Sequence, residues 1–243
     1  MGTDRRARSA QTSRRVTPVV VEDPIVARRT RYRSLREQRP RLFANDGPVV
    51  IDHGREETGC GVVHADPWIM FVVDPVVMPD GRLGRYGRLM TTIDAEGVAI
   101  LPMTRDGRIV LLRHWRHATQ SWHVEAPRGF GEIGLEPRLQ AAAELREELC
   151  VEGEMIALGH LHPDTGLLAS RVALFLAMLP DDAAPFHPEG LASVLVMDEA
   201  GFEDAVLDGS ITDPFAIAIW SRRRIREDRM RRAVPDDVRS VRT

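Results

Sequence analysis

One segment, residues 125–153, constrains the fold more than any other, because it joins a glycine-rich loop to a helix crowded with glutamates. Glu144, Glu147 and Glu148 follow a run of alanines, and at about 100° per residue their side chains fall within one narrow sector of the helix. Like charges at this spacing repel each other unless a cation offsets them. Hard divalent cations such as Mg²⁺ prefer carboxylate oxygens. The three glutamates are therefore compatible with a cation site, although, taken by themselves, a solvated acidic face paired with arginines is the favoured interpretation.

Short apolar runs separated by turn signals predict strands on both sides of this helix. Before it, Asp-Gly pairs at 80–81 and 106–107 mark two hairpins within residues 68–115. The helix is expected to begin at Pro137, a residue suited to a first helical position. Three more strands and two closing helices follow, in the segments MIALGHLH, RVALFLAML, LASVLVM, DEAGFEDAVLDG and DPFAIAIWSRRRIRED. The expected fold class is an α+β sandwich with a mixed or antiparallel sheet.

Composition limits the classes of protein that this chain can represent. Apolar residues make up 43% and charged residues 28%, and no apolar run approaches the roughly 20 residues of a membrane span. Cys60 and Cys150 are the two cysteines, so no disulfide framework is expected. These features predict a soluble protein of a reducing cytoplasm, with no membrane partner.

Charge is segregated along the chain, with arginine-rich ends and an acidic centre. The expected organisation has four parts: an Arg-rich, partly disordered N-terminal arm over 1–45, a β region over 46–92, the main domain over 93–225 and an Arg-rich tail over 226–243. Binding of nucleic acid by the basic ends is a less favoured expectation.

The segment resembles the signature of the Nudix hydrolases, which reads G-x5-E-x7-R-E-U-x-E-E-x-G-U, where U is aliphatic. Six of the nine defined positions match, namely Gly129, Glu144, Leu145, Glu147, Glu148 and Val151. The lead-in RIVLLRHWRHATQSWHVEAPRGFGE is similar to that of the ADP-ribose pyrophosphatase branch. This resemblance covers about residues 65–225. It implies a Nudix-type α/β/α sandwich with a mixed sheet, preceded by a small N-terminal β region.

Three positions depart from the signature. Leu135 and Ala143 replace a Glu and an Arg that pair with each other in the family, and replacing both partners of a buried ion pair by apolar groups can be neutral. Glu136 is an alternative source of the lost carboxylate. Cys150 replaces a glycine that ends the helix with positive φ, so the helix is expected to continue towards Gly153 instead.

The resemblance implies metal-dependent hydrolysis of a nucleoside diphosphate linked to another moiety, such as ADP-ribose or a nucleotide sugar, with Mg²⁺ or Mn²⁺ as cofactor. By the same resemblance, the metal ligands are Glu132, Glu144 and Glu148, and the catalytic residues are Glu147, Glu148 and Glu189. Arg113, Arg116 and Arg128 are the candidate contacts to substrate. Asp181 and Asp182 are alternatives to Glu189 as the general base.

Other readings remain open. Because the signature is degenerate, the rival function is a Nudix-fold module that binds a nucleotide, RNA or protein without turnover. A homodimer is a further expectation. Five histidines (His114, His117, His123, His160 and His162) suggest a metal cluster, but surface or hydrogen-bonded histidines are the favoured interpretation. For Trp115 and Trp122, packing in the core is favoured over stacking on a nucleobase.

Overall fold

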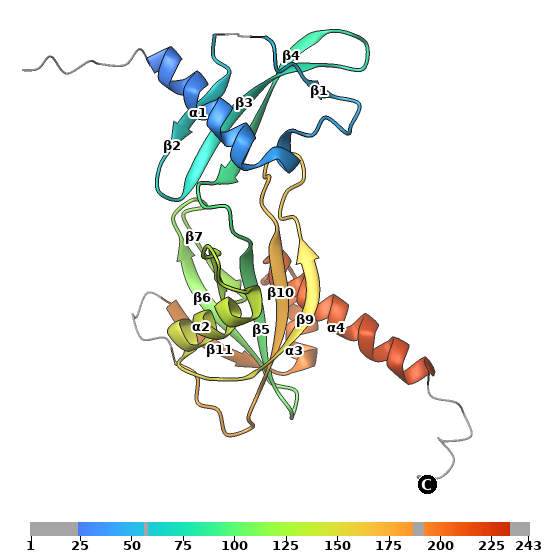
Figure 1. Ribbon diagram of the computed structural model, residues 1–243. Coiled ribbons are helices and arrows are strands. Elements are labelled where there is room, and N and C mark those ends of the chain that lie inside the picture. The colour runs from blue at the N-terminus through green and yellow to red at the C-terminus, as the bar shows by residue number, and fades with distance from the viewer. Residues whose placement is uncertain (1–23, 56–57, 187–191, 234–243) are drawn as a thin grey trace, which may run out of the picture.

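The computed structural model describes residues 24–55, 58–186 and 192–233, and it places them in two units (Figure 1). The smaller, N-terminal unit packs one helix against a four-stranded antiparallel sheet. Its elements are α1 (Pro24–Gln38), the short 3-10 helix η1 (Pro40–Phe43), β1 (Val50–Ile51), β2 (Gly61–Ala65), β3 (Ile69–Val77) and β4 (Leu83–Thr91). Residues 24–43 of the predicted arginine-rich arm therefore belong to a folded unit.

The larger unit is built on a seven-stranded mixed sheet, in which β5 and β10 are parallel and the other pairs are antiparallel. Its central path runs β11-β6-β5-β10-β9, while β7 pairs with β6 and β8 pairs with β5. The strands are β5 (Gly97–Thr104), β6 (Ile109–Arg116), β7 (Ser121–Glu125), β8 (Arg128–Gly129), β9 (Glu154–Leu161), β10 (Val172–Leu179) and β11 (Ala192–Met197). The helices are α2 (Pro137–Leu149), α3 (Glu199–Leu207) and α4 (Pro214–Ala233).

Alternation of side chains along the strands divides the core of this unit into two layers. On β5, Ala99 and Leu101 face a cluster that contains Phe202 of α3 and Ile219 of α4. Val98 and Ile100 face the opposite side, where α2 packs through Ala141, Leu145 and Leu149. Successive residues of a strand point to opposite faces, so a strand buried on both sides is apolar along most of its length, as β5 is from Val98 to Met103. The predicted α+β sandwich with a mixed sheet is confirmed.

The predicted hairpins and the beginning of the glutamate helix are also confirmed. Gly81 and Gly107 adopt φ values of 83° and 92° in the turns that join β3 to β4 and β5 to β6. Glycine carries no Cβ, so it tolerates this conformation where other residues are strained. Helix α2 has its proline, Pro137, at the first turn, as expected.

The prediction that α2 continues towards Gly153 is wrong. The helix ends at Leu149, and Cys150 caps it in the left-handed conformation with φ 54° and ψ 31°. The Cys150 backbone N–H donates to the carbonyl of Arg146 at 3.0 Å, which satisfies one carbonyl of the last turn. The helix therefore ends where a glycine would end it, although the residue is cysteine.

The small unit has its own core. Tyr32 and Leu35 of α1 and Phe43 of η1 are buried with Val62, Met70, Val72 and Met90 of the sheet. The Tyr32 hydroxyl donates to Asp74 at 2.5 Å, and the Arg88 Nε lies 2.7 Å from the other carboxylate oxygen. These contacts fix α1 against β3 and β4.

Two further expectations concern cysteines and membranes. Cys60 is buried, Cys150 is exposed and no disulfide joins them. Within the described ranges, no helix combines the length and the apolar character needed to cross a bilayer.

The two faces of α2 predict unequal effects of leucine truncation. Leu145 is fully buried, so Leu145→Ala should lower the free energy of unfolding by about 2–5 kcal/mol. Leu139 lies on the same helix with 58% exposure, and Leu139→Ala should change it by less than about 0.5 kcal/mol. Urea denaturation of both variants measures the difference. Equal losses would contradict the packing of α2 described above.

Candidate active site

Two glutamates of α2 form the centre of the candidate site. Glu144 and Glu148 are half-buried one turn apart, on the helix that covers the β8 side of the sheet. Gln140 Nε2 donates to Glu144 Oε1 at 2.8 Å, and the backbone N–H of Arg128 donates to Glu148 Oε2 at 3.3 Å. Glu144 is therefore held by a residue of its own helix, and Glu148 by the backbone of β8.

Close approach of α2 to this loop depends on a glycine. A Cβ built on Gly129 would lie 1.8 Å from Glu144 Oε1 and 2.0 Å from its Cδ. Only a residue without a side chain permits this separation. Gly129, which is the first residue of the signature, thus makes room for a carboxylate.

Burial and mutual repulsion keep both carboxylates hard to ionise. Burial, followed by the negative charge of Glu144, raises the pKa of Glu148 to about 7. The pKa of Glu144 is raised by burial, and the charges of Glu147 and Glu132 add to this effect. A cation between these groups would favour their charged forms and lower both pKa values.

A chain of alternating charges lies beside the glutamates. Glu125 is buried, and its two oxygens bind different arginines: Arg116 Nη2 lies 2.6 Å from Oε2 and Arg128 Nη2 lies 3.1 Å from Oε1. Arg128 Nη1 also lies 3.3 Å from Oδ1 of Asp213, which is buried. Buried charges are retained when they are paired in this manner. The arginine side chains keep 33% and 28% exposure, so each also faces solvent.

Asp213 connects this chain of charges to α4. Its Oδ2 accepts hydrogen bonds from the backbone N–H groups of Ala126 and Ala216, each at 3.0 Å. The second bond caps the N-terminus of α4, and the first ties the helix to the loop between β7 and β8. Burial raises the pKa of Asp213, although these two N–H groups and Arg128 oppose that effect.

The other acidic residues predicted for the site lie at different distances from Glu144 and Glu148. Glu147 and Glu132 are exposed, but both act electrostatically on Glu144. Glu189 lies outside the described residues. Asp181 accepts a hydrogen bond from the N–H of Asp106, which follows the C-terminal end of β5. Strand β8 pairs with the other end of β5, at Val98 and Ala99, which is roughly 20 Å away along a strand of this length. Asp181 is therefore remote from the glutamates.

Arg113 does not share a face with the glutamates. Arg113 and Arg116 both lie on β6, and residues an odd number of positions apart on a strand point to opposite sides of the sheet. The Arg113 guanidinium lies 4.6 Å from the centre of the Trp122 ring, and Trp122 packs edge-on against Trp115 at 5.7 Å. Trp115 and Trp122 are 41% and 48% exposed, so the expectation that they pack in the core is wrong. The strand pattern thus separates Arg113 from the site that Arg116 borders.

Histidines do not form a metal centre in the described part of the chain. His160 Nδ1 lies 2.5 Å from the carboxylate of Glu96, and Arg171 Nε binds the same carboxylate oxygen at 2.8 Å. Among the described residues, no three His, Cys, Asp or Glu side chains lie close enough together to hold a metal ion. His160 is thus an exposed histidine paired with the Glu96 carboxylate.

Glu125 and Asp213 are site residues that the sequence reasoning missed. Glu125 opens the glycine-rich segment, two residues before Pro127, and Asp213 directly precedes Pro214 at the start of a predicted helix. An Asp before a helical proline is a signal for an N-cap. That signal predicts the start of α4, but it does not predict that the Asp213 carboxylate also binds Arg128 and the N–H of Ala126.

The raised pKa of Glu148 predicts a pH dependence of stability. A carboxyl whose pKa rises on folding costs stability once it ionises, so its contribution to the unfolding free energy falls as pH rises from about 4.5 to about 7. Glu148→Gln removes this titration, and relative to wild type the variant should gain about 3 kcal/mol between pH 4.5 and pH 8. Denaturation with a chelator present at both pH values measures the gain. Glu152→Gln, at an exposed position, is the control, and equal pH profiles for Glu148→Gln and wild type would contradict the assigned burial.

Comparison with known proteins supports the fold. No protein-family model matches the chain, and no curated protein does. Among solved structures, the chain is similar to a crystal structure of an ADP compounds hydrolase, with a TM-score of 0.58 and 18% sequence identity. The similarity covers 71% of this chain and 92% of that one. At this identity the likeness concerns the fold alone, which is a mixed sheet flanked by helices.

Proposed function

We propose that the protein hydrolyses a nucleoside diphosphate linked to another moiety, with ADP-ribose or a related nucleotide sugar as the substrate class. The observation that carries this proposal is the pair of half-buried carboxylates, Glu144 and Glu148, held beside Gly129 with raised pKa values. Isolated buried carboxylates of like charge destabilise a fold. A site that retains them is suited to a cation and to the phosphates that the cation binds.

The donor chemistry fits Mg²⁺ or Mn²⁺. Glu144 and Glu148 are oxygen ligands from one helix, and Glu132 is a third candidate from the preceding loop. When bound, such an ion neutralises phosphate charge and supplies a nucleophile from its coordinated water. Carboxylates from one helix and one loop leave positions for substrate phosphates, as Mg²⁺ sites commonly do.

The arginines are proposed to orient the diphosphate. Arg116 and Arg128 are each anchored by one Glu125 oxygen, and each keeps part of its guanidinium exposed. A planar guanidinium so anchored loses little freedom when it binds a phosphate oxygen. Glu147 and Glu189 are proposed to handle protons, Glu147 because it projects from the same helix as the candidate ligands.

A binding module without turnover is the second candidate. It is favoured by the absence of a ready-made group of three metal-binding side chains among residues 24–55, 58–186 and 192–233. Calorimetry with ADP-ribose and chromatography of the products on one sample separate the two functions. The hydrolase predicts AMP and a sugar phosphate at millimolar Mg²⁺ or Mn²⁺. Tight binding with no release of AMP, across a panel of nucleotide diphosphates, would contradict the hydrolase and support the binding module.

Removal of one carboxylate tests the site directly. Glu148→Gln keeps the shape of the side chain but removes a charge that binds the cation, so the rate of AMP release should fall by about a hundredfold or more. Glu152→Gln is the control, because that side chain is 80% exposed just beyond the end of the same helix. Full activity of Glu148→Gln would show that the proposed cation site is wrong.

Gly129→Ala tests the close approach of α2. The added methyl would occupy the position of the Glu144 carboxylate, which can swing away because it ends a flexible side chain. Activity should therefore fall by about a hundredfold while the melting temperature changes little. In Gly47→Ala, the control, the new Cβ would meet nothing within 4 Å. Unchanged activity of Gly129→Ala would remove Glu144 from the site.

A further inference from the structure

A second cluster of like charges lies in the N-terminal unit. Arg29, Arg33 and Arg36 follow one another at helical spacing on α1, a helix in which Glu37 is the one acidic residue. Arginines one turn apart repel each other, as the glutamates of α2 do. Among the described residues, neither Arg33 nor Arg36 has a hydrogen bond or an ion pair with a carboxylate.

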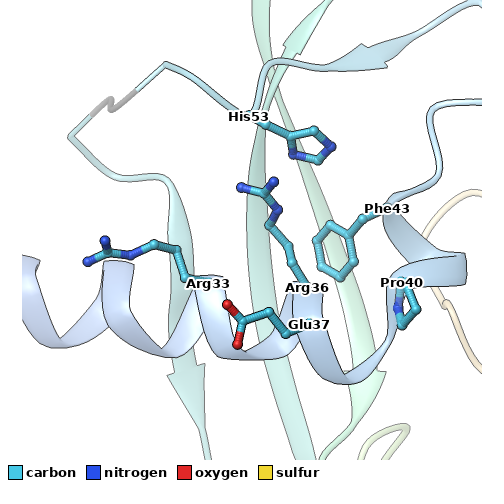
Figure 2. Close-up of a pocket in the computed structure, with 6 residues that line it drawn as sticks. All are labelled: Arg33, Arg36, Glu37, Pro40, Phe43 and His53. Atoms are coloured by element: carbon cyan, nitrogen blue, oxygen red, sulfur yellow. The ribbon is translucent and has the colours of Figure 1, made fainter.

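These arginines border a cavity. A hollow of about 400 Å³ between α1, η1 and the loop after β1 is lined by Arg33, Arg36, Glu37, Pro40, Phe43 and His53. In Figure 2 the guanidinium of Arg36 extends from α1 towards His53, beside the Phe43 ring. A smaller hollow shares Arg33, Arg36 and His53 with it and adds Arg29 and Arg55, against one carboxylate, Asp52. The volume is within the range of small-molecule sites, and the two arginines of the larger hollow outnumber its one carboxylate, Glu37.

Both walls of the cavity are fixed by contacts that do not use Arg33, Arg36 or His53. On the helix side, Arg39 donates to the carbonyls of Thr91 and Thr92 at 2.7 and 2.8 Å. Arg88 donates to the carbonyl of Leu42 at 2.8 Å and stacks over the Phe43 ring at 4.6 Å. The arginines of the cavity therefore project from a rigid support.

The loop that carries His53 is held in the same way. The side chain of Asn45 accepts from the N–H of Ile51 at 2.6 Å and donates to the carbonyl of Ile51 at 2.9 Å. The N–H of Asp52 then donates to the carbonyl of Pro75 at 2.8 Å. A site whose polar groups are placed in advance loses less entropy when it binds a ligand.

We propose that this cavity binds a small phosphorylated molecule, with Arg33 and Arg36 as the charged donors and His53 as a third polar contact. The site lies in a different unit from α2 (Figure 1), so it is separate from the proposed active site and does not depend on it. Guanidinium groups suit phosphate because their planar N–H pairs match two phosphate oxygens. A ligand with two phosphate groups carries more charge and more acceptor oxygens for these donors than a single phosphate does, so pyrophosphate should bind more tightly than inorganic phosphate.

Titration calorimetry of the full chain with pyrophosphate tests the proposal, in EDTA so that no divalent cation assists binding at α2. One saturable site is expected. Arg33→Gln with Arg36→Gln should weaken it by about tenfold or more. The matched control is Arg31→Gln with Arg41→Gln, which removes the same charge at exposed positions that do not line the cavity. The control should bind as wild type.

Several results would overturn the proposal. These are an absence of saturable binding at millimolar pyrophosphate, or equal weakening in the two double variants, which would indicate general attraction to positive charge. Tighter binding of a single-stranded RNA that needs Arg31 and Arg41 equally would assign the surface to nucleic acid. Should the double variant fail to fold, His53→Ala replaces it, because that side chain is exposed on a loop. It should weaken pyrophosphate binding several-fold, and no effect would count against the site.

Discussion

Glu125 and its two arginines are the interaction on which the geometry of the larger unit depends. The carboxylate is buried at the end of β7, and it binds Arg116 of β6 and Arg128 of β8 through separate oxygens. The Arg128 guanidinium forms an ion pair with Asp213, which caps α4. The backbone N–H of Arg128 donates to Glu148 on α2. Removing one partner from a buried ion pair costs about 3–5 kcal/mol, because the other charge stays buried. One buried carboxylate thus positions elements on both faces of the sheet relative to the candidate site.

The sequence was sufficient to predict elements that depend on local chemistry. Pro137 begins α2, glycines form the turns at 80–81 and 106–107, and helical spacing brings Glu144 and Glu148 together. It did not predict contacts that depend on strand pairing. Glu125 and Asp213 are 88 positions apart in the chain, and no local pattern links them. Arg113 shows a further limit: it lies on the same strand as the candidate contact Arg116, but at an odd separation that puts its side chain on the opposite face of the sheet.

Cys150 shows that the effect of a substitution in a signature depends on the packing around it. A cysteine in the left-handed conformation is strained relative to glycine, yet the helix ends there because Leu149 and Val151 are both buried against the same cluster. Tertiary packing outweighs the preference of one residue. The paired loss at Leu135 and Ala143 is similar in kind, since both positions are half-buried in the structure and neither carries a charge that would need a partner.

The central claim is that Glu144 and Glu148 form a crowded carboxylate pair that a divalent cation relieves. Carbon-13 NMR of the glutamate carboxyl groups, titrated against pH with and without Mg²⁺, measures this most directly. Without the ion, the resonance of Glu148 should titrate near pH 7, because burial and Glu144 raise its pKa. With Mg²⁺ its midpoint should move to lower pH, since a cation favours the ionised form. A midpoint near 4.5 that Mg²⁺ does not change would contradict the account.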